Sequence, residues 1–168
     1  ITRRQAGNVT HFSMYRNGEF IGNNIKSFYE FFLFRGIQEI SQYNNTSFRG
    51  CSNLENIVIP DTTHLLILNG MIFENTAIKT IVIPKNVIFN DTNSSIFARA
   101  DKLKTVVFLN PTPPIANHSV YDPIDTFFTE VYVPDNSIDL YRTAHNYNIP
   151  SEMIKPLSQY KGRIFNEI

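Results

Sequence analysis

Leu54-Glu55-Asn56-Ile57-Val58-Ile59-Pro60 is the stretch that decides the fold, because variants of it recur along the chain. The copies share the order apolar-x-x-apolar-x-apolar, usually closed by proline. The other three copies are residues 78–84, 103–108 and 128–134. The steps from Ile57 to Ile81, from Ile81 to Val106 and from Val106 to Val131 are 24, 25 and 25 residues. A fixed period of this length indicates a solenoid, in which each coil contributes one short strand.

The pattern within one copy predicts which side chains face the core. Side chains alternate between the two faces of a strand, so Ile57 and Ile59 point one way while Asn56 and Val58 point the other. A single coil buries too little apolar surface to offset its ordering entropy, whereas stacked coils bury one another. The proline after each strand removes a backbone donor and ends the ladder at the same place in each coil.

Recurrent phenylalanines support the same repeat. Phe48, Phe73 and Phe97 precede the copies by five or six residues, and we expect them to fill the core from the convex side. The convex stretches 61–69 and 85–95 differ in length and are rich in Asn, Asp and Thr. This composition predicts turns rather than long helices.

The block Phe48-Arg49-Gly50-Cys51-Ser52-Asn53-Leu54, continued to Pro60, resembles the consensus of BspA-like leucine-rich repeats. Such repeats occur mainly in surface and secreted proteins of gut and oral bacteria and of some mucosal protists. The similarity covers about residues 25–160, although the coil from Phe73 to Pro84 lacks the Gly-Cys pair. The resemblance implies a leucine-rich-repeat solenoid of the right-handed β/α superhelix class, with mostly short parallel strands. It also implies a non-catalytic binding role and export to the cell surface or the extracellular medium, with a lipid anchor or further domain upstream of Ile1.

Three regions are expected along the chain. They are an N-terminal segment with a capping helix over 1–35, about four to five repeat coils over 36–134, and a C-terminal capping helix with a tail over 135–168. Terminal coils need such caps, because their outer faces would otherwise expose the core.

The caps and the first coil can be placed more closely. Apolar residues spaced through 23–35 predict a short amphipathic helix. At the other end we predict a helix over about 137–146, N-capped by Asp135 or Asn136. We expect the first coil to begin with a strand at 36–40.

Few residues suggest chemistry. The four histidines stand at no metal-ligand spacing, and the single Cys51 occupies a repeat corner where a small buried hydrophobe is wanted. A loose acidic group of Asp122, Asp125 and Glu130 could hold a cation, but we expect a solvated loop there. We therefore expect no catalytic site, metal or cofactor.

Charge and hydropathy exclude some classes of binding partner. Fifteen basic and fifteen acidic residues cancel, so no charge field argues for nucleic acid or an anionic membrane surface. No apolar stretch is long enough to span a bilayer, so we expect no membrane insertion by this segment. The composition does not indicate an oligomeric state.

Ile1-Thr2 resembles the end of a calcium-loop segment that precedes the repeats in similar gut-bacterial proteins. The twelfth position of such a loop, where a glutamate should bind calcium through both carboxylate oxygens, would hold Gln5. We therefore expect a frayed terminus rather than a calcium site.

The outward face of the stacked strands is the candidate binding surface. One column is polar, the next is apolar, and Gln38 or Glu39 would begin the face in the first coil. The predicted binding residues are Asn56, Val58, Thr80, Val82, Thr105, Val107, Glu130 and Tyr132. An exposed apolar ladder flanked by amides and hydroxyls suits a protein or glycan on a host or neighbouring cell surface. The alternative is that these β-branched residues only reflect what strands prefer.

Two functions remain open at this stage. The first is an interaction module for adhesion or ligand capture through the strand face; the second is a structural spacer that presents a neighbouring domain and has no ligand of its own. An uncovered apolar ladder would favour the first, and a ladder covered by a loop or a second chain would favour the spacer. An enzyme ranks third, because the sequence offers no pocket of convergent titratable groups.

Overall fold

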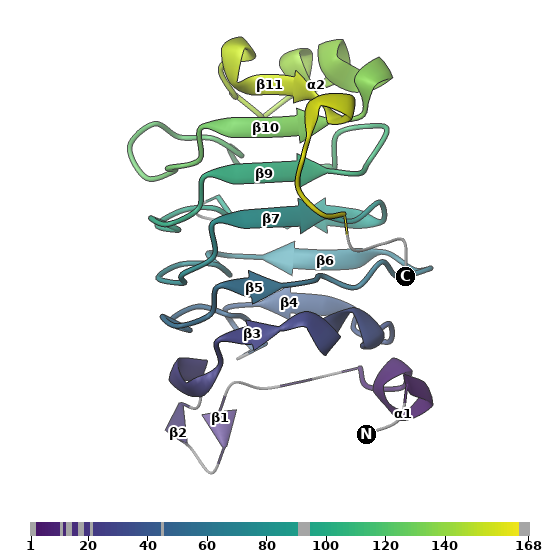
Figure 1. The fold of residues 1–168 in the computed structure, drawn as a ribbon, viewed down its shortest axis with the longest axis vertical. Coiled ribbons are helices and arrows are strands. Elements are labelled where there is room, and N and C mark those ends of the chain that lie inside the picture. Colours follow the sequence, from purple (N-terminus) through teal and green to yellow (C-terminus); the bar gives the residue numbers. More distant parts are fainter. Residues whose placement is uncertain are drawn as a thin grey trace.

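A computed structural model describes residues 3–10, 12, 15–16, 19–20, 22–44, 46–90 and 95–164. Its coils stack along the long axis, with the chain ascending from the N-terminal to the C-terminal end (Figure 1). The possible calcium-loop remnant at Ile1 and Thr2 lies outside the described residues.

Short strands form the front of the stack and run in one direction (Figure 1). We call them the front strands and their outer surface the strand face: β3 (Ser27–Phe28), β5 (Asn56–Ile57), β7 (Thr80–Ile83), β9 (Thr105–Phe108), β10 (Glu130–Val133) and β11 (Ile154–Pro156). A second, rear sheet consists of the parallel strands β4 (Glu39–Ser41), β6 (Leu66–Asn69) and β8 (Val87–Phe89). The described part of the chain is thus a repeat solenoid whose middle coils have a strand on each side.

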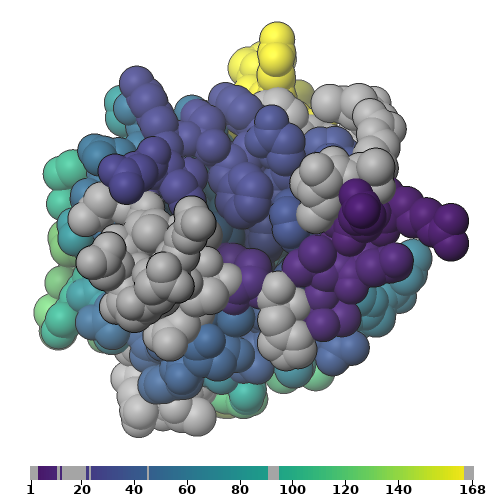
Figure 2. Space-filling view, turned by 90° about the horizontal axis from the view of Figure 1, so that it is seen from below, coloured from purple at the N-terminus to yellow at the C-terminus, as the bar shows by residue number. Residues whose placement is uncertain are grey.

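The remaining elements are short. The N-terminal end carries helix α1 (Arg3–Gly7), the antiparallel pair β1 (Tyr15–Arg16) and β2 (Glu19–Phe20), and the 3-10 turns η1 (Gly22–Asn24) and η2 (Tyr29–Leu33). The C-terminal end carries η3 (Asp135–Ser137), helix α2 (Ile138–Thr143), η4 (Ser151–Met153) and η5 (Leu157–Gln159). In Figure 2, which looks at the N-terminal end, the purple and dark-blue residues of the first segments lie in front of the later coils.

The register of the front strands follows the sequence period. Ile81 pairs with Val106, Val106 with Val131, and Val131 with Ile154, and all four side chains are buried. Residues one coil apart therefore stack on the same side, as the steps of 24 and 25 residues predict. The predicted core column is confirmed.

The phenylalanine anchors are also confirmed as core residues. Phe48, Phe73 and Phe97 are at most 1% exposed, and the rings of Phe73 and Phe97 stack at 6.4 Å. Phe128 meets Phe97 edge-on at 5.5 Å and carries the aromatic column into the next coil. Large rings at a fixed place in each coil fill the space between the front and rear sheets.

The convex stretches, predicted to form turns rather than long helices, also contain short strands. Residues 66–69 and 87–89 are strands β6 and β8, and buried residues alternate with half-buried ones along both. The strand at 36–40 was also misplaced, because β4 pairs with β6 and Glu39 therefore lies on the rear sheet. The strand face does not include Gln38 or Glu39. Its first member is β3, which pairs in parallel with β5.

The helix predicted over 23–35 was likewise wrong. The segment contains η1, β3 and η2 instead. Pairing of β3 with β5 straightens the chain at Ser27 and Phe28, and the aromatic residues that followed a helical spacing pack as a cluster. Phe31 is fully buried, with its ring 5.1 Å from those of Phe12 and Phe28 and 5.2 Å from that of Phe48.

The C-terminal helix exists but is shorter than predicted. Helix α2 begins after Ser137, the N-cap residue, which makes no side-chain capping hydrogen bond, so the predicted cap at Asp135 or Asn136 was wrong. Tyr141 faces inward as expected, and its hydroxyl donates to the Asn110 carbonyl oxygen at 3.0 Å. The hydroxyl of buried Tyr147 similarly donates to the Pro114 carbonyl at 2.9 Å. These two bonds tie the last coil to the one beneath it.

Candidate functional site: a groove on the strand face

The structure brings the eight predicted residues to one face. Thr80 pairs with Thr105 and Thr105 with Glu130, while Val82 pairs with Val107 and Val107 with Tyr132. Two vertical columns result, one polar and one mainly apolar. Asn56 and Val58 come from the neighbouring coil and line the same groove as Thr80 and Val82.

The apolar column is not exposed, which corrects the sequence-based prediction. Val107 is 0%, Val58 6% and Tyr132 9% exposed, and Val82 is half-buried. The cover over the upper part of this column is residues 157–164, which we call the C-terminal strap. Leu157, Tyr160 and Ile164 of the strap pack against the cluster of Val107, Leu109 and Tyr132. In Figure 1 the yellow strap runs down across the front strands rather than alongside them.

Polar and aromatic contacts hold the strap in place. The backbone N–H of Ser158 donates to Asp135 Oδ1 at 2.9 Å. Hydrogen bonds from the Ser158 side chain and then from its backbone lower the pKa of the Asp135 carboxyl. The rings of Tyr132 and Tyr160 lie 5.1 Å apart. Burial, followed by the nearby Tyr132, raises the pKa of Tyr160, so its hydroxyl stays protonated at neutral pH.

The polar column is already partly engaged within the chain. Glu130 Oε1 forms an ion pair with Lys155 Nζ at 2.6 Å, and Thr105 Oγ1 donates to Glu130 Oε2 at 3.4 Å. The Lys155 hydrogen bond lowers the pKa of Glu130, and Glu130 in turn raises that of Lys155. Lys155 also lies 5.8 Å from the centroid of the Tyr132 ring. Glu130, the charged residue of this column, is therefore already paired within the chain.

Glu130 of the loose acidic group forms an ion pair with Lys155. Asp125 has a raised pKa, caused first by burial and then by nearby Asp122, while Arg99 and His118 oppose the shift. The Asp122 carboxylate accepts the backbone N–H of Ile124, as in a loop turn. Within the described residues, no group of three or more His, Cys, Asp or Glu side chains could hold a metal ion.

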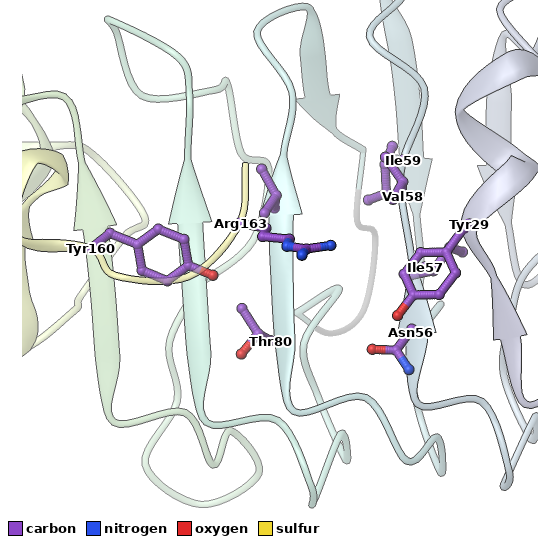
Figure 3. A pocket seen from close by; sticks show the side chains of 9 residues that line it. Tyr29, Asn56, Ile57, Val58, Ile59, Thr80, Tyr160 and Arg163 are labelled. Carbon is purple, nitrogen blue, oxygen red and sulfur yellow. The ribbon is translucent and has the colours of Figure 1, made fainter. Parts of the chain in front are cut away.

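The open part of the strand face lies at a break in the front ladder. Strands β3 and β5 form one pair, β7, β9, β10 and β11 form a separate sheet, and among these described strands no ladder joins β5 to β7. A cavity of about 230 Å³ occupies this break (Figure 3). We call it the groove. Its walls include Tyr29, Asn56, Val58, Thr80, Tyr160 and Arg163.

Four segments far apart in sequence converge on the groove. Tyr29 comes from η2, Asn56 from β5 and Thr80 from β7, while Tyr160 and Arg163 come from the strap. Asn56 Nδ2 donates to Ser27 Oγ at 3.3 Å, which orients its amide. In Figure 3 the Tyr29 ring lies beside Asn56, and the Arg163 guanidinium extends from the strap toward β5. The groove combines a polar rim with an apolar floor of Ile57 from β5 and of Val58 and Ile59, which follow it.

Sequence reasoning missed three of these walls. Tyr29 lay in a predicted helix, and Tyr160 and Arg163 lay in an unassigned tail. The available signal was the set Leu157, Tyr160 and Ile164, the large apolar side chains of residues 157–164. Such side chains are usually buried against an apolar surface, and the predicted apolar column of the strand face was a suitable one.

Two side chains weighed for chemistry have structural roles. Cys51 is fully buried, and burial raises the pKa of its thiol to about 12, so a thiolate nucleophile does not form at neutral pH. His64 Nε2 lies 2.9 Å from the Ile37 carbonyl oxygen and links two coils.

No helix in the described residues combines the length and the apolar character that a membrane crossing requires. Neither the curated proteins nor the solved structures gave a match to this chain. The family model described as the BspA type leucine rich repeat region matches residues 16–149 in six copies. The match covers most of the chain and agrees with the stacked parallel front strands and their inward-facing apolar columns. The chain belongs to the BspA-type leucine-rich-repeat family.

Proposed function

We propose that the chain is a non-catalytic interaction module that captures a ligand in the groove between β5 and β7. Repeats of this family are typical of interaction modules. The observation that carries the proposal is the groove itself, an opening in the strand face walled by residues from separate coils and from the strap. Clefts that combine an apolar floor with a few convergent polar groups are the usual form of a binding site.

This placement supports the proposed site and role. Of the predicted residues, Asn56, Val58, Thr80 and Val82 line the groove, whereas Thr105, Val107, Glu130 and Tyr132 support the strap and the strand column beside it. The partner is a protein or glycan on a host or neighbouring cell surface. The module acts in adhesion, at the cell surface or in the extracellular medium. Family resemblance supports this location, and the balanced charge argues against nucleic acid.

The two end segments are proposed to cap the repeat region. The segment over 1–35 and the segment over 135–168 serve as caps of the repeat region over 36–134. The main support is the burial of Tyr141 and Tyr147 against the last coils, together with the dense aromatic packing around Phe31 at the first.

One observation favours the spacer as a second candidate. The strap covers the apolar ladder, and a covered ladder is what a spacer without a ligand would have. In that case the strap would only shield apolar side chains from water, and the groove would be a gap left where two sheets fail to join.

A binding screen separates these two functions. The purified chain is tested against extracellular-matrix proteins and glycans, alongside two variants. Thr80→Arg fills the groove from an exposed position, and Thr129→Arg changes another exposed threonine that does not line the groove. Capture predicts that Thr80→Arg weakens binding at least tenfold while Thr129→Arg binds like the parent, with unchanged circular dichroism for both. Equal binding by both variants would remove the groove as the site. A parent chain that binds no panel member would favour the spacer.

A further inference from the structure

The charge of the groove restricts what it can hold. Arg163 is the one charged side chain among its lining residues, and it is exposed. Among the described residues, no carboxylate lies within ion-pair distance of its guanidinium. A guanidinium matches a carboxylate geometrically, because its parallel N–H groups can donate to both oxygens. The groove therefore favours a ligand that carries one negative charge.

The remaining walls favour a ring with hydroxyl groups. Tyr29 and Tyr160 present aromatic surface from opposite ends of the groove, and such surface suits an amphipathic partner with one apolar face. The Thr80 hydroxyl makes no hydrogen bond within the part of the chain that is described, and the Asn56 amide is a second polar group among the lining residues. The protonated Tyr160 hydroxyl adds a donor.

The size of the groove limits the ligand to a small unit. About 230 Å³ is below the roughly 300–1,000 Å³ of clefts that hold drug-sized molecules. One sugar ring fits such a space, while an extended peptide needs a long open edge with pockets for alternate side chains. β5 borders the groove on one side and β7 on the other, and β5 offers only the two strand residues Asn56 and Ile57 as an edge.

We propose that the groove binds a carboxylate-bearing sugar unit, such as a uronic acid within an acidic glycan, with Arg163 pairing with the carboxylate. Asn56, Thr80 and Tyr160 then bond to the ring hydroxyls, and the tyrosine rings cover its apolar face. This inference rests on the proposed capture function and names its ligand class. Because Arg163 belongs to the strap, a bound acidic sugar also joins the strap to the lower coils.

Two matched sugars test the charge requirement. Methyl glucuronide and methyl glucoside differ only by a carboxylate in place of a hydroxymethyl group, and their binding to the full chain is measured by NMR titration. We expect the glucuronide to bind at least tenfold more tightly, with an advantage that shrinks as salt is added. Equal affinities, or no binding of the glucuronide, would overturn the inference.

Two variants and a third probe locate the effect. Arg163→Gln should reduce the glucuronide affinity to that of the glucoside, whereas Lys161→Gln, an exposed cation on the same strap, should retain it. If both variants lose the same affinity for the glucuronide, the net positive charge of the strap, and not a specific contact in the groove, attracts the carboxylate. Acetyl-glutamate amide supplies a carboxylate without a ring, and binding as tight as the glucuronide would refute a sugar ligand. If every sugar fails while Thr80→Arg still abolishes capture of a panel partner, the capture function stands and the acidic-sugar inference falls.

Discussion

Shortening Val107 to alanine tests whether the strap truly covers the strand face. Val107 points outward from β9, the face that alternation assigns to solvent, yet it is 0% exposed because the strap packs over it. The two arrangements predict different costs. An exposed valine loses little on truncation, whereas a buried one loses its packing on both sides.

The expected cost follows from the burial. The substitution removes two methyl groups, worth about 0.8 kcal/mol each when buried. With the energy of the remaining cavity, we expect the free energy of unfolding to fall by about 2 kcal/mol. In a chain of this length, that loss corresponds to a melting temperature lower by about 4–8 °C. Urea denaturation followed by circular dichroism measures it directly.

Two controls make the test specific. Ile124, which is 85% exposed, should tolerate alanine within about 0.5 kcal/mol. Replacing Leu157, Tyr160 and Ile164 together with serine should remove the cover and reduce the cost of Val107→Ala to that of a surface site. A cost below about 0.5 kcal/mol for Val107→Ala in the intact chain would refute the covering role of the strap.

Four further predictions concern other parts of the fold. Because the pKa of Glu130 is lower in the folded chain than in the unfolded one, its ion pair with Lys155 stabilises the fold at pH values above the unfolded pKa. This stabilisation is lost as the pH falls through the folded pKa. Lys155→Met should remove this part of the acid destabilisation, as measured by urea midpoints between about pH 2 and 7. The buried Cys51 thiol, with a pKa of about 12, should resist alkylation at about pH 8 until denaturant is added, and rapid labelling of the native chain would contradict its burial. Tyr141→Phe should lower the free energy of unfolding by about 1–2 kcal/mol, because a carbonyl of the preceding coil loses its donor. A Cβ at Gly36 would stand 2.7 Å from a backbone oxygen of the N-terminal segment, so Gly36→Ala should loosen that segment and speed its proteolysis without unfolding the coils.

The repeat period predicts the front of the molecule well. Ile57, Ile81 and Val106 stand one coil apart, and a period fixes both the strand positions and the column that faces inward. The phenylalanine anchors carry the same information, since each precedes its repeat copy by five or six residues. Both signals are strong because stacking forces the same solution on each coil.

The rear sheet and the N-terminal end were harder to predict for a physical reason. Strands of two to four residues, such as β4 and β8, are too short to show a full alternation. Near Phe28 and Phe31 the aromatic spacing is compatible with a helix, but pairing with β5 decides the local structure. Tertiary contacts overrode the local pattern there.

The groove was beyond the reach of the sequence because it depends on two long-range events. One is the failure of β5 to join β7 in a ladder, and the other is the docking of a tail some 80 residues away in sequence from Thr80. Periodicity placed Asn56 and Thr80 on one face, but it carries no information on what Tyr160 and Arg163 cover.

The crossing direction of the strap has a mechanical consequence. In a solenoid each coil contacts only its neighbours, so a pulling force or a thermal fluctuation can peel coils away one at a time from an end. The strap joins the last coil to side chains on β7 and β9 as well as β10. The C-terminal coil therefore cannot detach until those contacts break together. The strap converts a stack that would unravel stepwise into one that resists force at that end as a single unit.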